Sequence, residues 1–108
     1  MTYDGLGMAR YRQKKYAEAE ECFLRSLGCL YHQPLVHFHL GIALAAQGKL
    51  TPAVQSLQRA LEFNPNLKEA HKVLIKVYRA QGHEALAHYH KTKAQELPDQ
   101  GEAEPDEA

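Results

Sequence analysis

Apolar residues recur every three to four positions along most of the chain, and no stretch alternates strictly between apolar and polar residues. Three-to-four spacing is typical of amphipathic helices, whereas strict alternation would indicate a half-buried strand. The pattern therefore predicts an all-α protein with six helices, near residues 2–14, 17–29, 35–47, 52–63, 67–81 and 84–96.

The residues between the expected helices are suited to ending one helix and starting the next. Gly48 and Gly82 can adopt the left-handed backbone conformation that often terminates a helix. Thr51 is a candidate N-cap, with Pro52 at the first helical position. Asn66 is a candidate N-cap for the fifth helix, with a glutamate three residues later to complete a capping box. The helices are therefore expected to form antiparallel pairs.

The chain also repeats itself with a period of 34 residues. Equivalent positions carry like residues, and small residues recur where large ones would hold two helices apart. The clearest matches are Leu6, Leu40 and Leu74; Gly7 and Gly41; Gln13, Gln47 and Gln81; and Ala19, Ala53 and Ala87. The pattern predicts three units, at about residues 1–33, 34–67 and 68–97, in which these leucines and alanines are buried.

The segment LGIALAAQGKLTPAVQSLQRALEFNPN, residues 40–66, resembles a tetratricopeptide repeat (TPR). The resemblance is carried by the Leu-Gly pair at 40–41, the turn residue Gly48, the alanines Ala53 and Ala60, and Pro65, and it extends over about residues 2–97. The outer units depart from the pattern at Arg10, Lys14, Tyr31, Ile75 and Lys91. The resemblance implies a right-handed α-solenoid of three TPR helix-turn-helix pairs, an α-α superhelix that buries its apolar faces by stacking.

In TPR proteins the first helices of successive units line a concave groove in which partners usually lie, so the resemblance implies such a groove here. The helical spacing i, i+4, i+7 selects its candidate residues, which are Asp4, Met8 and Tyr11, then Phe38, Ile42 and Ala45, then Lys72, Lys76 and Arg79. The middle of this groove is apolar and its C-terminal wall is basic. It suits a peptide or protein partner with apolar and acidic residues. One TPR class clamps a C-terminal carboxylate with Lys and Asn, but Asp4 and Met8 stand at those places.

Charge is distributed unevenly along a chain whose formal net charge is zero. The last eleven residues, PDQGEAEPDEA, hold five carboxylates and no base, so residues 1–97 contain 13 bases against 8 acids, a net +5. This segment has no large apolar residue with which to offset the entropy of ordering. Residues 98–108 are therefore expected to form a disordered acidic tail beyond a TPR domain at residues 1–97.

Two other functions compete with peptide binding. Nucleic-acid binding would use a basic patch, but the patch lacks interleaved aromatic residues and the chain lacks net charge, so no nucleic-acid partner is predicted. The patch comprises Lys68, Lys72, Lys76, Arg79, Lys91 and Lys93. The other alternative is a C-terminal accessory module of a larger enzyme. YHQPLVHFHLGIAL, residues 31–44, resembles TPR segments that follow phosphodiesterase or alkaline-phosphatase-like domains in some bacterial proteins.

The sequence predicts no enzyme, no metal and no cofactor. His37 and His39 are two apart on a helix and point about 200° from each other, so they cannot chelate one ion. No cysteine or carboxylate joins the seven histidines at metal-ligand spacing. GLGMAR at residues 5–10 begins like a dinucleotide-binding loop, but Arg10 replaces the third glycine and no strand precedes it. Cys22 and Cys29 lie roughly 10 Å apart along a helix, too far for a disulfide.

The apolar runs also bear on location and assembly. The longest, such as IALAA at residues 42–46, are too short to cross a bilayer, and no export signal opens the chain. A cytoplasmic location without a membrane partner is expected. Because no polar capping helix is evident, Tyr3, Leu86 and Tyr89 are expected on exposed end faces where two copies would meet end to end as a homodimer.

Overall fold

The computed structural model describes residues 2–97, which form six helices and no strand. The helices are α1 (Tyr3–Arg12), α2 (Tyr16–Cys29), α3 (Pro34–Ala46), α4 (Leu50–Phe63), α5 (Lys68–Ala80) and α6 (Glu84–Glu96). The predicted helices are confirmed to within about two residues at each end. The segment expected to be an acidic tail, residues 98–108, lies outside the described residues.

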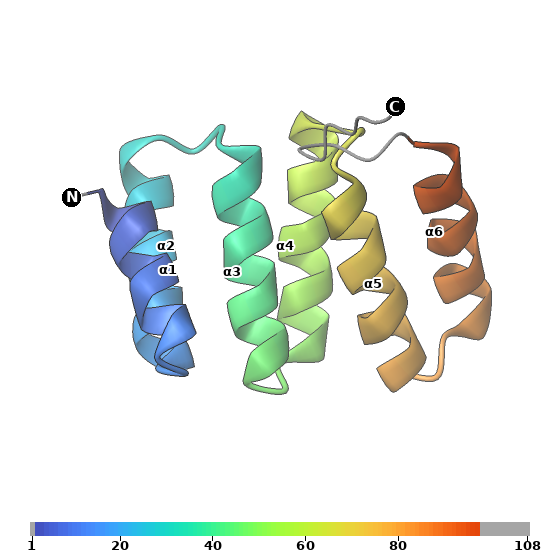
Figure 1. Cartoon of the computed structure of the whole chain (residues 1–108), viewed down its shortest axis with the longest axis horizontal. Helices are drawn as coiled ribbons and strands as arrows, with labels where there is room; N and C mark the ends of the chain where they lie inside the picture. The colour runs from blue at the N-terminus through green and yellow to red at the C-terminus, as the bar shows by residue number, and fades with distance from the viewer. Residues whose placement is uncertain (1, 98–108) are drawn as a thin grey trace, which may run out of the picture.

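The helices pack as three antiparallel pairs, and each pair stacks on the next to give a helical solenoid. Figure 1 shows them following one another in chain order across the molecule, from α1 and α2 at one end to α6 at the other. The first helices of the pairs, α1, α3 and α5, are neighbours along one side. None of the helices in the described part of the chain is long and apolar enough to cross a membrane.

In each of the first two helix pairs, a large side chain of the second helix fills the space above a glycine of the first helix. A Cβ atom at Gly7 would collide with the ring of Phe23, and one at Gly41 would lie 2.7 Å from Cγ of Leu57. Both large side chains are fully buried. The glycines shared by the first two units therefore serve helix packing, because any side chain there would separate the two helices.

The third pair packs differently, since Ile75 and Lys91 replace the glycine and the large apolar residue. Leu74 and Ala87 are buried between α5 and α6. Beside them the ring of Tyr78 stacks on His90, with centroids 5.5 Å apart and planes inclined by 18°. The third unit thus keeps the fold with an aromatic and imidazole contact in place of the glycine contact.

Burial follows the predicted pattern with one exception. Leu40, Leu74 and the alanines Ala19, Ala53 and Ala87 are buried as predicted. The prediction for Leu6 is wrong, because this residue is only half-buried. Leu6 lies on α1, and among residues 2–97 no preceding unit covers the face that α2 covers on α3. Equivalent repeat positions therefore differ in burial at the end of the stack.

The predicted N-caps at Thr51 and Asn66 are also wrong. The helix α4 begins at Leu50 after Lys49, and α5 begins after Leu67, and neither uses a side chain as a cap. Within each unit, the turn consists of one residue in the left-handed conformation and one linking residue, and the second helix starts directly after them. Thr51 therefore lies inside α4 and cannot be its N-cap. Asn66 instead lies inside a turn, where its N–H donates to Oδ1 of Asn64 at 3.2 Å.

The left-handed turn residue generates a first prediction. Gly48 and Gly82 have φ values of +79° and +82°, as predicted, but the equivalent residue of the first unit is Lys14 with φ 64°. A non-glycine residue is strained there, whereas glycine is not. Lys14→Gly should raise the free energy of unfolding by about 0.5–1 kcal/mol in urea titrations, after allowing for the entropy that glycine adds to the unfolded chain.

The reverse change is the control for this prediction. A Cβ atom at Gly48 would meet nothing within 4 Å, so Gly48→Lys tests the backbone conformation alone. It should lower the free energy of unfolding by a similar amount. Equal stability of all three proteins would contradict the assignment of strain to Lys14.

A second prediction concerns the glycine notch on α3. Gly41→Ala should lower the free energy of unfolding by about 1–3 kcal/mol, because the new methyl group overpacks against Leu57. The matched control is Gly28→Ala on α2, where a Cβ would meet nothing within 4 Å. That change should raise stability by about 0.5–1 kcal/mol through helix propensity. Chemical denaturation of both variants checks the pair, and equal effects would sink the packing argument.

Candidate functional site

The first helices of the three units enclose an open hollow on their shared side. It has a volume of about 280 Å³ and is lined by Tyr11 of α1, by Ile42, Ala45 and Ala46 of α3, and by Val73 and Lys76 of α5. We call it the concave hollow. Its walls are apolar apart from the Tyr11 hydroxyl and the Lys76 ammonium group, so it offers an apolar floor with two polar points.

Four of the nine predicted groove residues line this hollow, namely Tyr11, Ile42, Ala45 and Lys76. Met8 and Phe38 are partly buried and pack against the hydrophobic core, and Lys72 and Arg79 are exposed on α5 outside the hollow. Sequence reasoning missed Ala46 and Val73, which fall between the positions that the i, i+4, i+7 spacing selected. The spacing therefore selected residues on all three helices that border the hollow, but it missed two of the six residues that line it.

Asp4 is engaged within the fold. Its Oδ1 lies 2.7 Å from Nδ1 of His39, and their side chains are 31% and 16% exposed. The imidazole of His39 also lies against the ring of Phe23, with centroids 5.5 Å apart. This contact links α1 to α3, so Asp4 connects two units and is not an open groove carboxylate.

The two histidines that are two residues apart do diverge, as predicted. His39 faces Asp4, whereas His37 is buried, with Nε2 2.9 Å from the carbonyl oxygen of Tyr31. Burial lowers the pKa of His37 below its usual value of 6.5. Both histidines therefore have structural partners on opposite sides of the helix.

The basic side chains of the concave face are not paired with acidic residues in the described part of the chain. Lys72, Lys76 and Arg79 form no ion pair with any residue between 2 and 97. Burial, together with the nearby Tyr16, raises the pKa of Tyr11, which keeps its hydroxyl protonated as a donor. The face therefore presents uncompensated positive charge beside an apolar floor.

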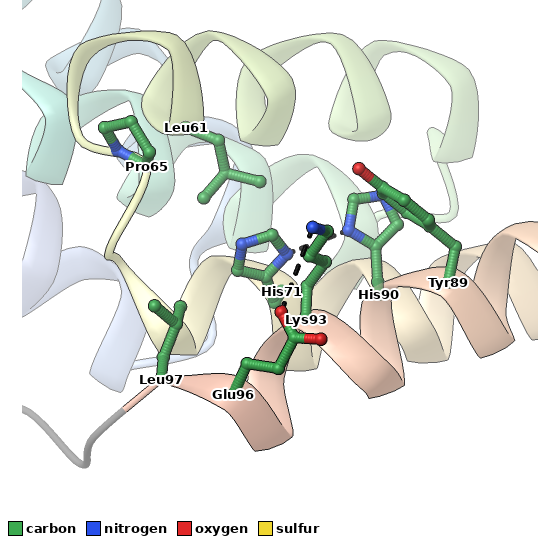
Figure 2. A pocket seen from close by; sticks show the side chains of 8 residues that line it. All are labelled: Leu61, Pro65, His71, Tyr89, His90, Lys93, Glu96 and Leu97. Carbon is green, nitrogen blue, oxygen red and sulfur yellow. Dashed lines mark hydrogen bonds and ion pairs between the residues drawn. The ribbon is translucent and has the colours of Figure 1, made fainter.

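A second pocket lies between α4, α5 and α6 and shares no lining residue with the concave hollow. Figure 2 shows its lining, which consists of Leu61, Pro65, His71, Tyr89, His90, Lys93, Glu96 and Leu97. Its volume is about 410 Å³. We call it the convex pocket. Lys93 and Glu96 form an ion pair of 3.9 Å beside it.

The wall of the convex pocket contains a pair of buried histidines that the sequence pattern did not reveal. Nδ1 of His71 lies 2.9 Å from Nδ1 of His90. The backbone of Pro65 also lies near His71, where it favours the protonated form and partly offsets the effect of burial on the pKa. In the contact between the two rings one Nδ1 donates and the other accepts, so one neutral imidazole carries its proton on Nδ1 and the other on Nε2.

Both members of this pair are held in the neutral form. Burial lowers the pKa of His71, and burial followed by the proximity of His71 lowers the pKa of His90 to about 4. Two imidazolium ions cannot share a dry contact between ring nitrogens. The described residues contain no group of three side chains able to hold a metal ion, and Cys22 and Cys29 are free thiols.

Comparison with known proteins relates this arrangement to a repeat family. Residues 34–67 match the family described as tetratricopeptide repeat. The TPR repeat-containing thioredoxin TTL4 of Arabidopsis thaliana is 30% identical over 96 residues. The matched region is 89% of this chain and only 14% of that protein, so the chain corresponds to a small part of its relative.

Solved structures share the architecture over nearly the whole described region. A mutant of MamA superposes with a TM-score of 0.84 and 28% identity, covering 90% of this chain and 71% of the MamA chain. Another MamA structure has a TM-score of 0.82 and 29% identity, over 94% of this chain and 55% of that one. The Yersinia enterocolitica type III secretion translocator chaperone SycD gives 0.85 over 88% and 72%, but at 20% identity it shows the shared fold alone.

The histidine pair generates a third prediction, on the pH dependence of stability. Since the pKa of His90 is about 4 in the folded chain against 6.5 unfolded, the unfolded chain binds the proton more tightly. The stabilisation is complete above about pH 6.5 and is lost as the pH falls towards 4. When the pH is lowered from 7.5 to 4.5, the free energy of unfolding should fall by about 2–3 kcal/mol less for His90→Phe than for wild type.

The control is His88→Phe, at an exposed position of the same helix. It should follow the wild-type pH profile in urea titrations, because acidic side chains titrate equally in all three proteins. Parallel profiles for wild type and His90→Phe would mean that the buried pair is not neutral as described.

Proposed function

Because the chain is a tetratricopeptide repeat protein, we propose that it is a non-catalytic scaffold that binds a peptide or protein segment in its concave groove. The observation that carries the proposal is the concave hollow, an apolar depression built by one helix from each unit. Large apolar surface left open beside uncompensated charge marks interaction sites in soluble proteins.

The chemistry of the hollow indicates what it would bind. Its floor, formed by Ile42, Ala45 and Val73, takes one large apolar side chain. Lys76 borders the hollow, and the exposed Lys72 and Arg79 continue the positive charge along α5. A segment with a leucine or phenylalanine between carboxylates would satisfy both features. Neither nucleic-acid binding nor association with a phosphodiesterase-like domain is supported by the relatives found.

End-to-end association of two copies belongs to the same proposal. Tyr3 on α1 is 43% exposed, and Leu86 and Tyr89 on α6 are 44% and 54% exposed. These groups lie at opposite ends of the stack, so a contact between them would be heterologous rather than two-fold symmetric. A contact of this kind would extend the solenoid from one copy into the next.

The fourth prediction tests the concave groove with a defined ligand. The probe is a fluorescein-labelled hexapeptide with a central Leu-Phe pair flanked by two glutamates on each side, measured by fluorescence anisotropy. Ile42→Ala should weaken binding about tenfold, mainly through faster dissociation, because it removes an apolar contact. Lys76→Glu should chiefly slow association and reduce its dependence on salt, because exposed charges steer encounter.

Each change has a matched control away from the hollow. Leu35→Ala at the start of α3 repeats the loss of an apolar side chain, and Lys91→Glu on α6 repeats the charge reversal. Both controls should bind like wild type. If Ile42→Ala and Lys76→Glu also do so, the groove assignment is wrong. If a peptide with lysines in place of the glutamates binds equally well, the electrostatic part of the proposal fails.

A further inference from the structure

The convex pocket has a counterpart one repeat earlier in the chain. A pocket of about 230 Å³ lies between α2, α3 and α4, and we call it the first-repeat pocket. Six of the eight residues that line the convex pocket stand 34 positions after residues that line this one. The pairs that matter below are Tyr31 and Pro65, His37 and His71, and Arg59 and Lys93. The two pockets are therefore the same structural position in successive units.

The backbone supports this equivalence. In the first-repeat pocket, His37 donates through Nε2 to the carbonyl of Tyr31 at 2.9 Å. In the convex pocket, His71 interacts with the backbone of the equivalent residue, Pro65. The turns also start from equivalent C-cap residues, Leu30 and Asn64. The side chains at positions 31 and 65 thus leave the chain from the same place relative to the histidine.

What differs is the place of the tyrosine ring: the first-repeat pocket has Tyr31 where the convex pocket has Pro65, and the convex pocket has Tyr89, beside His90 and Lys93, where the first-repeat pocket has Gln55. The ring of Tyr31 lies edge-on to His37, with centroids 4.9 Å apart and planes at 79°, and edge-on to Phe63 at 5.9 Å. Arg59, which is paired with Glu62, lies close enough to Tyr31 to interact with it electrostatically. The first-repeat pocket therefore contains a tyrosine of its own, held between an imidazole and a phenyl ring and near a cation.

The convex pocket keeps the surroundings of that ring and lacks the ring itself. Pro65 replaces Tyr31, and Leu97 replaces Phe63. The imidazole is retained as His71, and the ion pair is retained as Lys93 and Glu96. The smaller side chains at two positions account for the larger volume, about 410 Å³ against about 230 Å³.

We propose that the convex pocket binds an aromatic side chain, a tyrosine above all, presented by a partner protein in the place that Tyr31 occupies one repeat earlier. The bound ring would lie against His71 and Leu97, with Lys93 beside it as Arg59 is beside Tyr31. The second ring nitrogen of His90, directed away from His71 in Figure 2, is a further polar group at the wall. Residues 98–108 cannot supply this ring, because they contain no aromatic residue.

A metal ion is a poorer occupant of the same pocket. The two histidine nitrogens that face each other are already joined at 2.9 Å, and Glu96 is paired with Lys93. An ion would have to break the histidine contact and then find a third ligand, which the described residues do not offer.

The experiment is an NMR titration of ¹⁵N-labelled protein with the tripeptide Ac-Gly-Tyr-Gly-NH₂, with Ac-Gly-Ala-Gly-NH₂ as the control ligand. The tyrosine peptide should shift the amide signals of His71, His90 and Leu97, and the alanine peptide should leave them unchanged. Ile42→Ala, which alters only the concave hollow, should not affect these shifts, so binding here is separable from binding in the groove. Equal shifts from both peptides would overturn the proposal.

Variants that supply the missing ring give the decisive comparison. Pro65→Tyr and Leu97→Phe each restore a residue of the first-repeat pocket, and each should weaken binding of the tyrosine peptide at least tenfold while the protein stays folded by circular dichroism. Tyr31→Ala does the opposite and should create a second set of shifts around His37 and Phe63. If Tyr31→Ala does not fold, the two filling variants decide alone. Wild-type affinity in both would refute the assignment.

Discussion

The contact on which the rest of the structure depends is the insertion of one large side chain into the notch above a glycine of the preceding helix. Gly7 receives Phe23, and Gly41 receives Leu57. Because the helices approach closely there, one face of each first helix is committed to its own pair. Ile42 follows Gly41 and, about 100° further round the helix, belongs to the concave side. The position of the glycine on the first helix therefore determines which side of that helix faces the hollow.

The third unit shows what happens when this contact is absent. Ile75 leaves no space for a large side chain above it, and Lys91 is not a large apolar residue that could fill such a space. The pair is held together instead by Tyr78, His71 and His90. The positions equivalent to His90 hold Ser56 and Cys22, which are smaller. The imidazole of His90 therefore brings a polar, titratable group into a space that the other units fill with small side chains. For that reason we expect the packing of this unit to depend on pH, and the unit also borders the convex pocket.

The sequence predicted what a repeat can encode and missed what depends on position within the stack. The 34-residue period located the helices, the left-handed glycines and the burial of Leu40 and Leu74. The period could not give the exposure of Leu6, because burial depends on having a neighbouring unit. The contacts of Asp4 with His39 and of His71 with His90 were also missed, since each joins two helices whose relative rotation no local pattern specifies.

The absence of a cap at Thr51 has a similar origin. A capping residue is favoured where a helix starts from an extended loop. Here the linking residues Lys15, Lys49 and His83 adopt nearly the same backbone angles, with φ between −94° and −85°. Because the same geometry recurs in all three turns, it follows from the packing of each helical hairpin. The capping preference of individual residues therefore does not set where the second helix begins.

The two binding surfaces share one structural element, the helix α5. Val73 and Lys76 line the concave hollow, and His71 lines the convex pocket. Residues 71 and 73 point about 200° apart on a helix, so one turn of α5 contributes to both faces. In a solenoid each unit is stabilised mainly by its neighbours, and the last unit has a neighbour on one side only among the described residues. A ligand bound at either proposed site would therefore stabilise the helix that completes the other, and the unit without the glycine contact has the most stability to gain.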